Sequence, residues 1–260
     1  QAHAFQLRHV ETLRLLSFPD TADWYFDKMY KVFRNTVRLA RATVGKVMSM
    51  PMPTDAFLKD LDLLKERMKA VRQILLDAET TSVRLVVNPE RMVINETKRA
   101  YTYLCLYNLT VECLVINRLL PEEARGQYPD AKFEEQSRYM QMIDESFSPL
   151  KMLKAYQSPT EVVGVRSLER LADQLFGDTD PAAVYSSEKS MEIFNRDGVD
   201  TLALKLPFSS KDQVELYKSE DVLIVTVGWY KRSVALPYSL VKKQAHKAEF
   251  KDGRLMISFK

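Results

Sequence analysis

The N-terminal part of the chain carries a helical pattern of apolar positions. Between residues 20 and 44, apolar side chains recur at helical spacing among charged residues, which predicts a helix. A second helix is predicted to begin at Thr54 or Asp55, because either side chain can cap a helix start. Its apolar positions alternate in steps of four and three residues: Phe57, Leu61, Leu64, Met68, Val71 and Leu75. This seam predicts packing on another helix, and so a helical subdomain over about residues 20–80.

Short apolar runs then alternate with longer helical patterns. Strands alternating with helices indicate βαβ units and a parallel sheet. Strands that are apolar almost throughout fit a sheet covered on both faces. The expected strands are residues 82–87, 111–117 and 150–155, and the expected helices are residues 90–107, 133–147 and 165–176, the last ended by Gly177.

The hydrophobic period changes to two from Thr201 onward. Six short alternating runs follow, and Asp252-Gly253 predicts a hairpin turn between the last two. This pattern is typical of a β-sandwich. The stretch 177–200 contains turn signals around one short helical pattern at 188–194, which predicts a linker.

Together these patterns predict a mixed α/β protein with two domains. Residues 1–176 are expected to form a parallel-sheet α/β portion that includes the helical subdomain. Residues 177–200 are expected to link it to a small all-β sandwich over residues 201–260.

Charge and composition exclude several classes of function. The net charge of +3 is mild, and the basic residues are interspersed with acidic ones, so we expect no nucleic-acid partner. No apolar run approaches the roughly 18 residues that a membrane span needs. The first ten residues lack the basic start and apolar core of a signal peptide. We therefore expect no transmembrane segment and a cytoplasmic location.

The cysteines and histidines give no sign of a metal or covalent catalytic site. Cys105 and Cys113 form no CxxC pair, so we expect two small buried apolar side chains. His3, His9 and His246 are too scattered to indicate a metal cluster or a Ser-His-Asp triad. We expect no metal ligands and no catalytic residue within these classes.

The sequence contains no phosphate-binding loop of the P-loop type. Such a loop needs two glycines five residues apart, followed by Lys and then Ser or Thr. Gly45 is followed by Lys46, but Ala40 and Val47 occupy the other required positions. A Gly-rich dinucleotide fingerprint is also absent from the sequence.

Four short segments, in order along residues 11–176, carry a family resemblance. They are Glu-Thr-Leu-Arg-Leu-Leu-Ser-Phe-Pro at 11–19, Asn-Pro-Glu-Arg-Met-Val-Ile-Asn-Glu-Thr-Lys-Arg at 88–99, Val-Ile-Asn-Arg-Leu-Leu-Pro at 115–121, and Glu-Val-Val-Gly at 161–164 with Leu168, Leu171 and Ala172. Each resembles a segment of the arsenite-pump (ArsA-type) and tail-anchored-protein-targeting ATPases. The resemblance implies a P-loop-NTPase-like fold for the parallel-sheet portion, and an ATP-binding, ATP-hydrolysing protein of this anion-transporting ATPase family.

The C-terminal residues resemble the α-crystallin-like, small heat-shock-like domain of many bacterial members. The matching segments are Leu-Pro-Phe at 206–208, Val-Thr-Val-Gly at 225–228, Lys-Arg at 231–232, Leu-Pro at 236–237 and Asp-Gly-Arg-Leu at 252–255. The two resemblances together imply an ATPase portion joined to a small β-domain.

The resemblance stops at Glu11, where the family has a further loop and, before it, the phosphate-binding half. Phosphoryl transfer depends on the charged groups of that half. We therefore expect these 260 residues to be incomplete and inactive alone, with ATP as cofactor and its magnesium held by the missing N-terminal part. A degenerate natural protein is the alternative to a fragment.

The resemblance also implies a site for the nucleotide base. Asn117 and its neighbour Arg118 match the base-reading strand end, and the loop of Pro159, Thr160, Glu161 and Val162 matches the segment that closes over the base. An Asn amide offers one acceptor and a donor pair, which suits the adenine edge. The alternative is that Asn117 only caps the turn before Pro121.

The resemblance leaves the partners less defined. Met48, Met50 and Met52 match the region that forms a hydrophobic client groove in the targeting relatives, and methionine suits adaptable apolar binding. The alternative is that they are ordinary core or loop residues. We expect a homodimer with a hydrophobic protein client or a membrane partner protein. The rival functions are a non-catalytic protein-interaction module and a chaperone-like module built on the β-domain.

Overall fold

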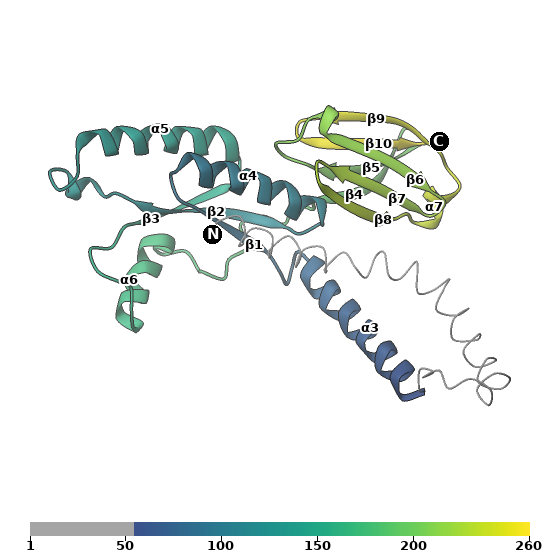
Figure 1. Ribbon diagram of the computed structural model, residues 1–260, viewed down its shortest axis with the longest axis horizontal. Helices are drawn as coiled ribbons and strands as arrows, with labels where there is room; N and C mark the ends of the chain where they lie inside the picture. The colour runs from purple at the N-terminus through teal and green to yellow at the C-terminus, as the bar shows by residue number, and fades with distance from the viewer. Residues whose placement is uncertain (1–54) are drawn as a thin grey trace, which may run out of the picture.

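The computed structural model describes residues 55–260 (Figure 1). Helix α3, Asp55–Leu76, begins where the sequence predicts it. Phe57, Leu64 and Val71 from its apolar seam are 54%, 53% and 53% exposed. The helix predicted over residues 20–44 and the three methionines of the expected client groove lie outside the described residues.

An α/β portion follows, and its elements are those that the sequence pattern predicts. They are β1 (Val83–Val87), α4 (Arg91–Leu106), β2 (Val111–Leu119), the short 3₁₀ helix η2 (Glu122–Ala124), α5 (Asp130–Phe147), β3 (Lys151–Tyr156) and α6 (Val165–Phe176). The three strands are parallel, in the order β1-β2-β3. Helices α4 and α5 lie over one face of this sheet, and α6 lies on the other side, against β3 (Figure 1).

Alternation along the strands builds the core of this portion. Leu85 and Val87 of β1 stand beside Leu114 and Ile116 of β2, and all four belong to the cluster formed with α4 and α5. Cys105 and Cys113 are buried free thiols, as predicted, at 1% and 0% exposure. Burial raises the pKa of the Cys105 thiol to about 11, so this thiol stays protonated and unreactive at neutral pH.

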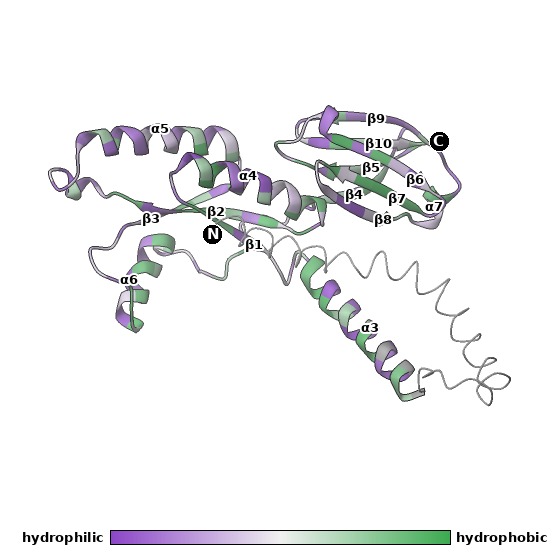
Figure 2. Ribbon diagram, viewed as in Figure 1, coloured by the Kyte–Doolittle hydropathy of each residue, from purple (hydrophilic) through white to green (hydrophobic). Residues whose placement is uncertain are grey.

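The C-terminal part is a sandwich of two antiparallel sheets. One sheet has the order β4-β5-β10-β9 and the other β6-β7-β8. The strands are β4 (Met191–Arg196), β5 (Val199–Lys205), β6 (Val214–Ser219), β7 (Val222–Val227), β8 (Tyr230–Ala235), β9 (Ala245–Lys251) and β10 (Arg254–Phe259), with short helices η3 (Lys211–Gln213) and α7 (Tyr238–Val241). The central strand β7 is hydrophobic along its length, whereas the edge strand β9 is mostly hydrophilic (Figure 2). Charged side chains on an edge strand discourage unwanted strand pairing.

The helix predicted at 188–194 is wrong, because residues 191–196 form strand β4. Met191 pairs with Leu204 and Phe194 with Thr201. Asp197 and Gly198, with φ of 52° and 79°, make the tight turn between β4 and β5, as Asp-Gly does in two-residue hairpins. The long-range pairing with β5 overrides the local helical spacing. The sandwich thus includes a strand in the segment expected to be the linker, and the limits of the two domains remain predictions.

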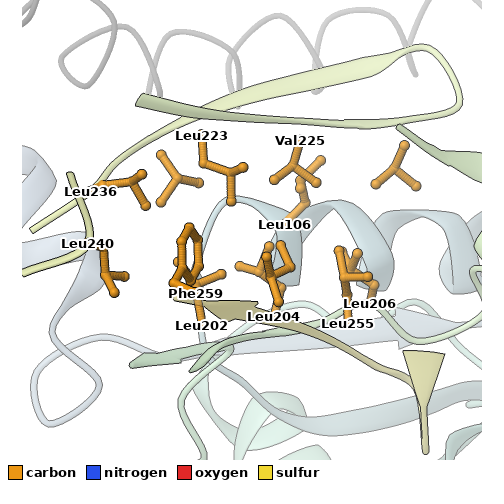
Figure 3. Close-up of a cluster of buried hydrophobic side chains, with 13 residues drawn as sticks. Leu106, Leu202, Leu204, Leu206, Leu223, Val225, Leu236, Leu240, Leu255 and Phe259 are labelled. Atoms are coloured by element: carbon orange, nitrogen blue, oxygen red, sulfur yellow. The ribbon is translucent and has the colours of Figure 1, made fainter. Parts of the chain in front are cut away.

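The two parts meet at the C-terminal end of α4. Leu106, the last residue of α4, is fully buried among the leucines of the sandwich (Figure 3). Arg232 of β8, which is 3% exposed, donates a hydrogen bond to the Leu106 carbonyl. Helix ends leave carbonyls unsatisfied and favour a cation nearby, and α4 has no basic residue in its own last turn. The β-sandwich therefore supplies the C-terminal cap of a helix that belongs to the α/β portion.

Further contacts surround this joint. The Thr102 hydroxyl of α4 donates to the Pro207 carbonyl, and the Ser190 hydroxyl donates to the Leu109 carbonyl at 3.0 Å. Phe208 lies edge-on to Tyr101 and Phe147, with ring centroids 6.2 and 5.5 Å apart. Edge-to-face aromatic pairs add stability beyond the area they bury. The sandwich and the α/β portion thus share a continuous packed surface.

A buried ion pair fastens the segment between the two parts. The Nε of Arg84 lies 2.6 Å from a carboxylate oxygen of Glu112, whose side chain is 1% exposed. Glu112 also accepts a hydrogen bond from the Tyr185 backbone N–H at 3.1 Å, and Arg84 donates to the Ala183 carbonyl at 3.3 Å. Burial alone would raise the pKa of Glu112, but the bonds from Arg84 and Tyr185 outweigh it and lower this pKa. The segment around 183–185 is therefore held against β1 and β2 by both members of this ion pair.

We expect Leu106→Ala to destabilise both parts together. Deleting a buried leucine side chain costs about 2–5 kcal/mol in core positions, and Leu106 joins the helix to the sandwich core. Urea denaturation should show this loss, and hydrogen exchange should show α4 and the sandwich strands losing protection in parallel. Leu168→Ala, at a leucine that is 55% exposed, is the matched control and should change stability by less than about 0.5 kcal/mol. Equal losses of stability in the two variants would contradict the role of Leu106 in joining α4 to the sandwich.

We expect the stability lost in Glu112→Gln to depend on pH. At neutral pH, the variant should unfold more easily by roughly 1–3 kcal/mol, because it loses charge-assisted bonds. The folded-state pKa of Glu112 is lowered, so its stabilisation is complete above the unfolded pKa of about 4.3 and disappears as pH falls through the folded value. Urea denaturation between pH 7 and pH 3 should show the gap to wild type closing at the acidic end. The control is Glu215→Gln, at an exposed carboxylate; a gap for Glu112→Gln that stays constant with pH would refute this linkage.

Candidate functional site

The carboxyl ends of β1, β2 and β3 meet at one edge of the parallel sheet. Ligands of open α/β sheets bind outside this edge. The backbone N–H of Gln157, just after β3, donates to the Leu119 carbonyl at the end of β2 over 2.7 Å. This bond fixes the start of the β3–α6 loop beside the end of β2. The two segments that the sequence assigns to the base site therefore leave the sheet side by side.

Asn117 and Arg118 lie at an irregularity in β2. The pairing of β2 with β3 shifts register between Ile116 and Leu119, and Arg118 has a φ of 60°. Such a bulge redirects side chains at the end of a strand. Asn117 is half-buried and Arg118 is exposed. Among residues 55–260, the Asn117 amide makes no hydrogen bond, so nothing in this range supports its alternative role as a turn cap.

The loop expected to close over the base is open to solvent. Pro159, Thr160 and Glu161 are exposed and Val162 is half-buried. Gly164 ends the loop with a φ of 82° and precedes the first residue of α6, a conformation that glycine adopts at little cost. The start of the β3–α6 loop is bonded to the end of β2 through Gln157, but no bond joins residues 159–162 to Asn117 within the described residues.

A cleft of about 480 Å³ opens beside this edge, between α5 and α6. Its lining residues are Leu119, Leu120, Pro121, Glu122, Glu123, Gln136, Met140, Lys154, Tyr156 and Gln174. None of the residues predicted for the base site is among them, so the structure places those residues next to the cleft rather than around it. Sequence reasoning missed Gln136 and Gln174, because no local pattern marks a glutamine that bonds to a distant backbone.

The described residues provide no metal centre. Within residues 55–260, no three His, Cys, Asp or Glu side chains gather so as to hold a metal ion. Among the same residues, no helix is both long enough and apolar enough to span a bilayer. The side chains along this edge and its cleft are amides, such as Asn117, Gln136 and Gln174, apolar groups, and the charged groups of Arg118, Glu122, Glu123 and Lys154.

Comparison with known proteins identifies the family of this chain, and the matched range includes this edge of the sheet. The family model described as "Anion-transporting ATPase" matches residues 10–177. The chain belongs to this family. A second model, described as an HSP20-like domain found in ArsA, matches residues 197–259. The expected family, the α/β fold with its parallel sheet and the β-domain are thereby confirmed.

Two curated relatives match nearly the whole chain, and a third matches about two thirds of it. The putative arsenical pump-driving ATPase 1 of Aquifex aeolicus is 34% identical over 95% of this chain and 63% of its own length. The putative arsenical pump-driving ATPase of Chlorobaculum tepidum is 34% identical over 96% and 62%. ATPase GET3C of Arabidopsis thaliana is 32% identical over 64% of this chain and 43% of its own length.

The chain spans about three fifths of the length of the arsenical pump-driving relatives. The match to the ATPase model begins at residue 10. The expectation that a phosphate-binding half is missing is not confirmed by these comparisons. The activity and partners of the whole protein are therefore proposals for this anion-transporting ATPase family member.

We expect the backbone at Arg118 to favour glycine over a branched side chain. A non-glycine residue at a φ of 60° costs about 1–2 kcal/mol, and most for a branched one. Arg118→Gly should therefore be as stable as wild type or slightly more so, whereas Arg118→Val should be less stable by about 1–2 kcal/mol. Thermal unfolding of the three proteins measures this difference. A valine variant as stable as the glycine variant would show that residue 118 is not held in this conformation.

Proposed function

We propose that this chain carries the adenine-recognising edge of an ATP-dependent, arsenite-pump-type ATPase. The observation that supports this most directly is the position of Asn117, an amide without a hydrogen bond in the described part, at the carboxyl end of β2 within the region matched by the family. Arg118 would border the base, and the loop Pro159–Val162 would lie against its other side.

The chemistry of Asn117 suits adenine. Its carbonyl oxygen can accept from the exocyclic amine of adenine, and its NH₂ group can donate to a neighbouring ring nitrogen. Guanine presents the opposite donor and acceptor order at the corresponding positions, so the amide would favour ATP over GTP when it is held with its oxygen toward the exocyclic group. A site that pairs buried hydrogen-bonding groups with its ligand discriminates strongly against ligands that leave them unpaired.

The phosphates and magnesium need other residues. Residues 55–260 contain no ligand cluster for a metal ion, and the 260 residues contain no P-loop motif. We assign no phosphoryl-transfer step to the described residues, and we expect no ATP hydrolysis above background from this chain alone. When bound, magnesium would neutralise phosphate charge.

The partners follow from the family and remain part of the proposal. We expect a cytoplasmic homodimer that engages a hydrophobic protein client or a membrane partner protein, with Met48, Met50 and Met52 as candidate client contacts. The relatives' names describe arsenical pump-driving ATPases and a GET3-type ATPase. We expect no nucleic-acid partner, because the net charge is only +3.

A chaperone-like or protein-interaction role of the β-domain is the second candidate. Its support is the HSP20-like match and two aromatic side chains, Trp229 and Tyr238, which are 96% and 76% exposed. Exposed aromatic residues are enriched at protein contacts. This role predicts client binding that is insensitive to nucleotide, whereas the ATPase proposal predicts that ATP changes it.

We expect Asn117→Ala to weaken ATP binding and to reduce the preference for ATP over GTP. The substitution removes a donor and an acceptor, and a neutral hydrogen bond contributes about 0.5–1.5 kcal/mol. Loss of two bonds corresponds to roughly ten- to a hundredfold in affinity. Titration of a fluorescent ATP analogue, with unlabelled ATP and GTP as competitors, measures both quantities in this chain.

Asn95→Ala is the matched control for this measurement. Asn95 is exposed on α4 and lies by a separate pocket, beside Ser209 and Gln213 of the sandwich. The control variant should bind ATP as wild type does. Unchanged ATP affinity and unchanged selectivity in Asn117→Ala would show that Asn117 does not read the base.

A further inference from the structure

We infer that Gln136 of α5 is a positioning residue for the proposed base site, supported by Gln174 of α6. The inference rests on the proposed function and names residues that neither the sequence pattern nor the family resemblance indicates. Gln136 would not touch the nucleotide. It would hold the strand end that carries Asn117 in the conformation that binds.

Both polar atoms of the Gln136 side-chain amide form hydrogen bonds with the backbone of one residue, Leu120. Its Oε1 accepts from the Leu120 N–H at 2.7 Å, and its Nε2 donates to the Leu120 carbonyl at 3.1 Å. Leu120 follows β2 directly, three residues after Asn117. A two-bond contact fixes the orientation of the backbone as well as its distance from α5. The turn after the bulge is thus set by a helix rather than by the strand alone.

Hydrogen bonds continue this contact across the edge. The Leu119 carbonyl accepts from the Gln157 N–H, which begins the β3–α6 loop. The neighbouring Tyr156 N–H donates to the Oε1 of Gln174 at 3.0 Å. One chain of bonds therefore runs from α5 through the ends of β2 and β3 to α6. Both segments proposed to face the base are attached to it.

The chain of bonds matters because the site residues are otherwise loosely held. The Asn117 amide has no hydrogen bond within the described part, and the loop Pro159–Val162 is largely exposed. The apparent affinity for a ligand is proportional to the fraction of molecules that hold the binding conformation, so it falls when that fraction falls. The glutamine contacts raise that fraction by restricting where the two segments can lie. Loss of the Gln136 contacts should therefore act through Asn117.

The test is a double-mutant cycle between Gln136→Met and Asn117→Ala. Methionine keeps the length and volume of glutamine and removes both bonds. We expect Gln136→Met to weaken binding of the fluorescent ATP analogue by about three- to tenfold and to reduce the ATP preference over GTP. In the Asn117→Ala background, Gln136→Met should have little further effect on binding, because the free-energy effects of substitutions at coupled residues are not additive.

Two further variants separate positioning from general stability. Gln136→Glu keeps an acceptor for the Leu120 N–H but sets a carboxylate oxygen against the Leu120 carbonyl in place of the Nε2 donor, so we expect it to weaken ATP binding as well. Gln141→Met is the matched control on the same helix, because Gln141 is exposed and, within residues 55–260, its side chain donates only to Glu145. It should bind ATP as wild type does. Hydrogen exchange at the Leu120 amide should accelerate in Gln136→Met alone.

Each outcome decides a separate point. Wild type that binds no ATP analogue would overturn the proposed function, and this inference with it. Weakening by Asn117→Ala but not by Gln136→Met would leave the function standing and overturn the positioning role. Equal weakening by Gln136→Met in both backgrounds would also overturn it, since Gln136 would then act independently of Asn117.

Discussion

The organisation of this protein depends on the bond between Arg232 and the last carbonyl of α4. That carbonyl belongs to Leu106, whose side chain is buried in the sandwich core. A helix end placed inside a second domain must have its carbonyls satisfied there, because an unpaired buried polar group is costly. Arg232 meets this requirement with a charged donor, and the two parts of the chain become one packed unit.

Helix α4 also connects this joint to the proposed binding edge. Helix α4 starts directly after Asn88-Pro89-Glu90, which follow the carboxyl end of β1, and it ends at Leu106. The same helix thus begins at the edge where ligands of such sheets bind and ends in the β-sandwich. Additional contacts, from Thr102 to Pro207 and from Tyr101 to Phe208, fasten its last turns. The β-domain is therefore built onto the ATPase portion rather than carried beside it on a loose linker.

The proposed binding edge combines a residue indicated by the family resemblance with contacts particular to this fold. Asn117 at its bulge is the residue that the resemblance indicates, and the family match extends over it. Its surroundings depend on contacts between elements, such as Gln136 on Leu120 and the bond from Gln157 to Leu119. Recognition of a base needs both a reading group and a fixed frame around it.

The sequence by itself determined most of the elements, because their hydrophobic periods are local: the alternation of strands and helices from β1 to α6 and the two-residue period of the sandwich. The resemblance of residues 115–121 to the family also singled out Asn117 from sequence alone. Tertiary structure decided the rest. Residues 188–194 carry a helical spacing, yet pairing with β5 makes residues 191–196 a strand. In sequence, Arg232, Glu112 and Gln136 look like ordinary polar residues. The partner of Arg232 lies 126 residues away, those of Glu112 lie 28 and 73 residues away, and that of Gln136 lies 16 residues away. Such partners are set only when the chain has folded, since local spacing carries no information about which distant backbone groups will need a donor or an acceptor.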